Sequence, residues 1–168
     1  MKTLVVYSTL TGNTKKVAEA IYDSLSGEKE ILDVKDAIKL ENCGQYDKVI
    51  VGYWVDKGDA DAAAKKFMEK LSEKKVGTFG TLGAYPDSEH AQKSVEKVRA
   101  FLEEKNNEVI AEFICQGSID PKLIERMRGM GMNGPHPVTP EREARWAEAA
   151  KHPDENDLKN AKEAFAKI

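Results

Sequence analysis

Apolar residues in the first two-thirds of the chain alternate between short continuous runs and stripes with helical spacing. A continuous run such as Val49-Ile50-Val51 is typical of a strand buried on both faces of a parallel sheet. The predicted strands cover residues 4–8, 28–34, 49–53, 76–82 and 108–115, the more polar second strand lying at a sheet edge. The predicted helices cover residues 13–25, 60–72 and 88–105. Because the crossovers are helical, this order predicts an α/β fold: a five-stranded parallel doubly wound sheet with helices on both faces.

The tail from residue 117 onward has a different pattern. Asp120-Pro121 is a typical helix start and predicts a short helix to about Met127. A loop rich in Met, Gly and Pro is expected over Met127–Pro137. Two more helices are expected, over 139–150 and from Asp154 to the end. We expect a single domain over 1–168, with 117–151 as an insertion or lid before a final helix that packs on the sheet.

Composition narrows the functional classes. The 168 residues are 40% hydrophobic and 33% charged, with a net charge of −3 and no basic run, which argues against nucleic-acid binding. No apolar run approaches the roughly 20 residues that a membrane span needs, so no membrane partner is expected. Cys43 and Cys115 have neither metal nor redox spacing, and we expect them to be structural thiols of a cytoplasmic protein. His90 and His152 lie in polar helix starts and are expected in solvent.

The turn from Ser8 to Thr14 joins the first strand to the first helix and has the composition of an anion site. It contains hydroxyls, Gly12 and Asn13, but neither Lys nor Arg. Free N–H groups and the positive dipole end of a helix bind phosphate, and neutral hydroxyls complete such a site. The turn lacks the Gly-Lys-Ser/Thr ending of a nucleotide P-loop and has one of the three glycines of a dinucleotide fingerprint. We expect it to bind a phosphate without transferring it.

Two further loops follow predicted strands and therefore share an edge of the sheet with this turn. They cover residues 53–59 and 81–87, and each offers a large aromatic side chain, Trp54 in the first and Tyr85 in the second. A tryptophan and a tyrosine on neighbouring loops can hold a flat ring system between them by stacking. The sequence therefore predicts a phosphate-bearing ligand with a planar ring.

The pattern Ser8-Thr9-x-Thr11-Gly12-Asn13-Thr14 is similar to the phosphate loop of the flavodoxin family, and the strand spacing and aromatic loops also resemble that family over roughly residues 2–116 plus the final helix. The resemblance implies the strand order 2-1-3-4-5 and a non-covalently bound FMN. It implies cofactor contacts from Ser8, Thr9, Leu10, Thr11, Gly12, Asn13, Thr14, Tyr53, Trp54, Val55, Asp56, Lys57, Gly58, Thr81, Leu82, Gly83, Ala84 and Tyr85. The second aromatic loop departs from the usual Gly-Asp-x-x-Tyr arrangement, and the extra length follows the fifth strand instead of splitting it.

The resemblance implies an electron carrier that supplies a partner reductase, with no catalytic residues of its own. Acidic side chains near the ring disfavour the reduced flavin anion, so we expect a low potential. The acids near the two loops are Asp56, Asp59, Asp61, Asp87 and Glu89. The chain looks closer to the flavodoxin-like proteins of anaerobic bacteria, some of which serve tetrapyrrole metabolism, than to ordinary flavodoxins.

An alternative stays open. The protein would then be a flavin-dependent reductase, or an enzyme that degrades haem or another tetrapyrrole, with Met127–Pro137 closing over the substrate. In that case haem or a bilin is a partner and His136 is a candidate haem ligand. A third possibility, a binding module without flavin, predicts a colourless protein.

Overall fold

The computed structural model describes residues 1–135 and 137–168 and contains a twisted parallel sheet at its centre. Five strands lie in the order β2-β1-β3-β5-β6, which is the predicted order of the five long strands. Their bounds are β1 Lys2–Tyr7, β2 Glu28–Asp33, β3 Lys48–Asp56, β5 Lys75–Leu82 and β6 Glu108–Gln116. All neighbouring pairs among them are parallel. The predicted α/β fold with a parallel doubly wound sheet is confirmed.

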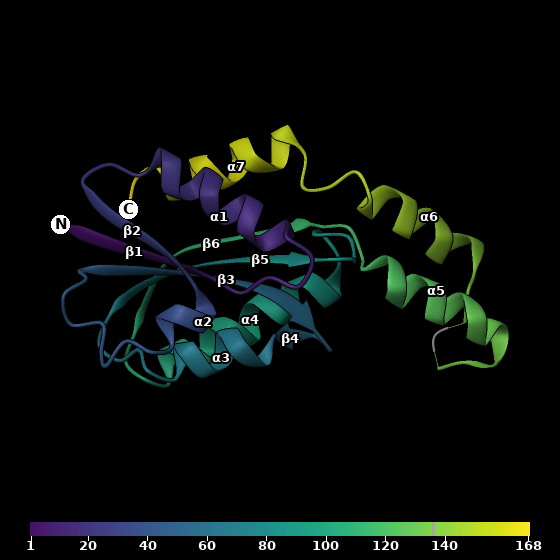
Figure 1. The fold of residues 1–168 in the computed structure, drawn as a ribbon, viewed down its shortest axis with the longest axis horizontal. Helices are drawn as coiled ribbons and strands as arrows, with labels where there is room; N and C mark the ends of the chain where they lie inside the picture. The colour runs from purple at the N-terminus through teal and green to yellow at the C-terminus, as the bar shows by residue number, and fades with distance from the viewer. Residues whose placement is uncertain (136) are drawn as a thin grey trace.

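Helices cover both faces of this sheet (Figure 1). One face carries α1 (Asn13–Ser24) and α7 (Glu155–Phe165), and the other carries α2 (Val34–Ala37), α3 (Ala62–Met68) and α4 (Glu89–Glu103). Because successive strand residues point to opposite faces, Leu4 belongs to the core under α2, α3 and α4, whereas Val5 belongs to the core under α1 and α7. Both faces are therefore dry, as the continuous apolar runs predict.

The centre of the sheet requires small residues where aromatic rings cross it. A Cβ atom on Gly52 of β3 would lie 2.1 Å from Cζ of Phe79, whose ring covers the glycine backbone. Phe79 in turn meets Phe165 of α7 edge to face, with ring centroids 6.3 Å apart. Glycine at position 52 thus allows the α7 side of the core to close.

Two elements were not predicted because they are very short. The helix α2 starts on Asp33, whose side chain accepts a hydrogen bond from the backbone N–H of Lys35. The strand β4 (Asp59–Ala60) pairs antiparallel with the end of β3 through a two-residue turn at Lys57 and Gly58. Both turn residues have positive φ, 50° and 77°, which is typical of a type I′ hairpin.

The tail forms a helical hairpin that projects beyond the carboxyl ends of the strands (Figure 1). It consists of α5 (Pro121–Met130), a short 3₁₀ helix η1 (Gly131–Asn133) and α6 (Pro140–Ala149). The prediction of a loop from Met127 is wrong for 127–133, because α5 continues through Gly129. Its last turns are held to α6 by Arg128, which donates two hydrogen bonds to the carboxylate of Glu143.

Candidate functional site

The turn between β1 and α1 leaves the first N–H groups of the helix without a side-chain cap. Gly12 occupies the N-cap position with a φ of 95°, and the first turn of α1 contains no acidic residue. Each of the other six α-helices in the described part of the chain has a capping side chain, from Asp33, Asp61, Ser88, Asp120, Thr139 or Asp154. The uncapped N–H groups of α1 are therefore free to bind an anion.

Hydrogen bonds hold this turn in place and tie it to the second aromatic loop and to the base of the hairpin. The hydroxyl of Thr9 accepts a bond from the N–H of Gly12 at 3.0 Å. The amide of Asn13 donates to the carbonyl oxygen of Ser118 at 2.9 Å. The hydroxyl oxygens of Thr14 and Thr81 lie 2.9 Å apart. The turn is thus held in place by residues from β5 and from the start of the tail.

Asp61 links the phosphate turn to the first aromatic loop, a role that the sequence analysis missed. Its carboxylate accepts hydrogen bonds from the hydroxyl of Ser8 at 2.5 Å, from the N–H of Trp54 at 3.1 Å and from the N–H of Ala64 at 3.2 Å. The side chain is 2% exposed, and burial raises its pKa although all three bonds favour the charged form. Since the Ser8 hydroxyl is committed to Asp61, it acts as support for the turn.

A cavity of about 590 Å³ brings the predicted loops together. Fourteen of the eighteen predicted residues line it: Thr9, Leu10, Thr11, Asn13, Thr14, Trp54, Val55, Asp56, Lys57, Thr81, Leu82, Gly83, Ala84 and Tyr85. The remaining four, Ser8, Gly12, Tyr53 and Gly58, do not. The ring of Tyr53 is fully buried in the core, because adjacent residues of β3 point to opposite faces, so a contact of this residue with a cofactor would have to come from its backbone.

The tail, which the sequence analysis expected as an insertion or lid, supplies a wall of the same cavity from residues that were not predicted as site residues. It is made by Gly117, Ser118, Ile119, Asp120, Leu123, Met127, Arg142, Arg145 and Trp146, joined by Ser88 and His90 from the region of α4. The spacing of four between Leu123 and Met127, and again between Arg142 and Trp146, places each pair on one helix face. This four-residue spacing is the pattern in the sequence from which the cavity wall could have been predicted. His136 lies outside the described residues.

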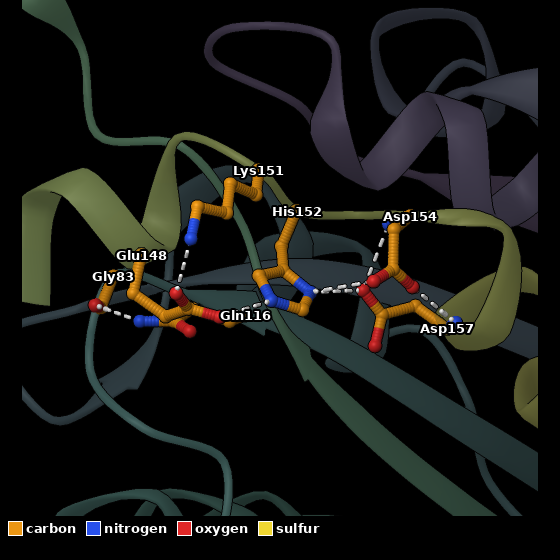
Figure 2. Close-up of polar contacts among 7 residues, drawn as sticks. All are labelled: Gly83, Gln116, Glu148, Lys151, His152, Asp154 and Asp157. Carbon is orange, nitrogen blue, oxygen red and sulfur yellow. Dashed lines mark hydrogen bonds and ion pairs between the residues drawn. The ribbon is translucent and has the colours of Figure 1, made fainter.

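The hairpin is attached to α7 through a cluster of titratable groups around His152 (Figure 2). Nδ1 of His152 lies 2.5 Å from a carboxylate oxygen of Asp157, and Nε2 lies 3.2 Å from a carboxylate oxygen of Glu148. The bond to Asp157 is the largest factor that raises the pKa of the imidazole. The expectation of a solvated His152 is therefore wrong, since the ring joins the end of α6 to the first turn of α7.

These features define a sheet of flavodoxin type with a cavity at the carboxyl ends of its strands. A family model of the flavodoxin domain matches residues 4–166, so the chain belongs to the flavodoxin domain family. The resemblance inferred from the phosphate turn is confirmed. No helix in the described ranges, 1–135 and 137–168, is long and apolar enough to cross a membrane.

Named relatives and solved structures agree with this family. The flavodoxin-like domain-containing protein BilS of Clostridioides difficile (strain CD3) is 40% identical over 172 residues, covering 99% of this chain and 95% of the relative. A flavodoxin from the domain Archaea superposes with a TM-score of 0.66 at 20% identity, covering 100% of this chain and 96% of that one. A Fusobacterium nucleatum flavodoxin bound to flavin mononucleotide superposes with a TM-score of 0.54 at 20% identity, covering 71% and 72%.

Proposed function

We propose that this protein binds FMN non-covalently and carries electrons at low potential to a partner reductase. The observation that carries the proposal is the uncapped N-terminus of α1, which opens into the same cavity as the two aromatic loops. A helix N-terminus suits a phosphate, and the loops suit a planar ring. Flavin mononucleotide has a phosphate at one end and a planar ring at the other, so a site with both features fits this ligand. Flavin mononucleotide bound to a structurally similar flavodoxin supports the choice.

The residues present fit the cofactor. The N–H groups at the start of α1, with the hydroxyls of Thr9, Thr11 and Thr14, would hold the phosphate. Trp54 and Tyr85 would flank the ring from the ends of β3 and β5, and the backbones of 55–58 and 82–84 would meet its polar edge. When bound, FMN supplies one- and two-electron redox chemistry. The protein positions the ring and tunes the charge around it.

Charges around the loops support the low potential, although fewer acids are free than the sequence implied. Asp59 pairs with Lys65 at 2.9 Å and Glu89 pairs with Lys93 at 2.7 Å, while Asp61 is buried under the loops. In the described part of the chain Asp56 and Asp87 form no ion pair, and both are exposed. These two carboxylates oppose a reduced flavin anion, whereas Lys57, Arg142 and Arg145, which line the same cavity as Asp56, act in the opposite sense.

An apolar, partly exposed rim supports the expectation of redox partner proteins. Leu10 is 60% exposed and Tyr85 is 42% exposed, and both line the cavity. Exposed apolar side chains around a cofactor edge suit transient docking of another protein. Cys43 and Cys115 are both free and buried, which suits a reducing compartment and supports a cytoplasmic location.

A second candidate function is a flavin-dependent reductase that acts on a bound substrate, and the cavity wall from α5 and α6 favours it. In this proposal residues 117–151 form a lid on a single flavodoxin-like domain. The alternative in which haem or a bilin is bound cannot be argued from His136, which lies outside the described residues. It is supported by the family resemblance and by the cavity wall that the tail provides.

The test of the proposed function uses the purified protein. We expect a yellow protein that releases FMN on heating, identified by mass spectrometry, and a redox titration with a midpoint below that of free FMN. A colourless protein that cannot be reconstituted with FMN would contradict the binding proposal. An FMN-loaded protein with a midpoint above that of free FMN would contradict the low-potential part alone.

A further inference from the structure

We propose that α5 and α6 form, within the same cavity, a pocket beside the flavin for a flat apolar molecule that carries a carboxylate. The position next to a flavin rests on the proposed function, whereas the pocket itself rests on the tail residues that line the cavity. Such a molecule would share the cavity with the flavin.

One side of this pocket is apolar. Leu123 and Met127 lie four residues apart on α5, and Ile119 precedes the helix. Trp146 of α6 is 4% exposed, so its indole is part of the packed wall. Apolar and aromatic walls with few polar groups are typical of sites for small organic molecules.

The polar side of this pocket contains two arginine side chains that have no hydrogen-bond or ion-pair partner among the described residues. Arg142 and Arg145 lie three residues apart on α6, and both line the cavity. Nη1 of Arg142 and Nε of Arg145 are buried and make no hydrogen bond. Neither side chain forms an ion pair with any carboxylate of the described residues. Buried N–H groups of a guanidinium are almost always paired, so these two atoms indicate an acceptor supplied by a ligand.

A nearby arginine of the same hairpin shows the contrast. Arg128 satisfies its guanidinium with two hydrogen bonds to Glu143, at 3.0 and 2.7 Å. The tail therefore has carboxylates available for pairing, yet Arg142 and Arg145 remain unpaired. A carboxylate matches the planar fork of a guanidinium, and the apolar wall adds a requirement for a carbon skeleton. The N-terminus of α1 already provides a separate site for phosphate.

The experiment titrates 2-naphthoate, 2-naphthalenemethanol and 2-naphthyl phosphate into the full chain by calorimetry, with and without saturating FMN. The variants are the pair Arg142→Gln with Arg145→Gln, the charge-retaining pair Arg142→Lys with Arg145→Lys, and Arg126→Gln as control. Arg126 is an exposed arginine on α5 that does not line the cavity. Circular dichroism checks that each variant is folded.

We expect the wild type to bind naphthoate at least about tenfold more tightly than the alcohol, since a hydrogen bond to a charged group is strong. The Gln pair should lose this preference, the Lys pair should keep part of it, and Arg126→Gln should keep all of it. Equal affinity for acid and alcohol, or an unaffected Gln pair, would overturn the pocket. With FMN bound at the α1 site, a tenfold preference for the phosphate would overturn the carboxylate assignment, and loss of FMN affinity in the Gln pair would assign the arginines to the flavin. If FMN does not bind at all, the proposed function fails while the FMN-free titration still decides the pocket.

Discussion

Asp61→Ala tests whether one buried carboxylate holds two loops of the site together. The substitution removes the acceptor of the Ser8 hydroxyl, of the Trp54 N–H and of the Ala64 N–H. The Ser8 hydroxyl can turn toward another acceptor, but the two backbone donors are fixed. The effect should therefore appear both in the stability of the fold and in the position of the Trp54 loop.

The magnitude follows from these contacts. Loss of an N-cap side chain costs about 1 kcal/mol, and a part-buried N–H left unpaired, such as that of Trp54, costs about 2 kcal/mol. Removal of a buried charge returns part of this cost, because burial raises the pKa of Asp61 and so disfavours the carboxylate in the folded state. We expect the free energy of unfolding of the FMN-free protein to fall by about 2 kcal/mol, which corresponds to a decrease in Tm of roughly 6 °C.

The assay is urea denaturation of the FMN-free protein together with FMN titration. FMN affinity should fall at least about tenfold, because the loop that carries Trp54 loses its anchor. Asp87→Asn, at an exposed acid of the second aromatic loop, is the control and should stay within about 0.5 kcal/mol of wild type. If Asp61→Ala also stays within that range and binds FMN normally, the assignment of Asp61 as a link between the loops is wrong.

The remaining predictions concern packing and pH. Gly52→Ala should destabilise the fold by about 3 kcal/mol in urea denaturation, because its Cβ would collide with the Phe79 ring, and a loss under 1 kcal/mol would contradict the packing. Gly129→Ala in α5, where a Cβ meets nothing within 4 Å, should instead stabilise by about 0.5 kcal/mol, and a loss would show that the helix is not formed there. His152 has a raised pKa because of Asp157, so its stabilising effect is complete below the unfolded pKa of about 6.5 and is lost as pH rises through the higher folded pKa. Urea denaturation should show a smaller loss of stability between pH 6 and pH 9 in His152→Gln than in wild type; equal losses would contradict the ion pairs.

The long elements could be predicted because their patterns are strong and local. The run Val49-Ile50-Val51 is buried on alternating faces in the structure, and this requires both faces of the sheet to be covered. The two short elements could not be predicted from periodicity, since two and four residues contain no full repeat. The turn residues Lys57 and Gly58 were the available indication of the β4 hairpin.

The tail was harder, because tertiary contacts decide its local structure. Gly129 and the methionines around it are weak evidence for a helix, and the pairing of Arg128 with Glu143 extends α5 over them. The extended helix places Met127 in the cavity wall, where the sequence had suggested an irregular loop.

In the candidate site, too, features that depend on local sequence could be predicted and features that depend on tertiary contacts could not. The phosphate turn and both aromatic loops were predicted from residues close together in the chain, and the cavity collects most of them. The role of Asp61 could not be predicted, because its bond to Ser8 spans 53 positions. The buried and unpaired guanidinium atoms of Arg142 and Arg145 could not be predicted either, since an arginine pair on a polar helix is normally solvated.

The most direct test compares the affinity of FMN with that of riboflavin, which carries the same ring without the phosphate, by calorimetry on the FMN-free protein. If the uncapped start of α1 binds the phosphate, two charge-assisted hydrogen bonds make FMN bind about a hundredfold more tightly than riboflavin. Equal affinities, or no binding of either flavin, would contradict the central claim that this turn and the two aromatic loops hold one flavin mononucleotide.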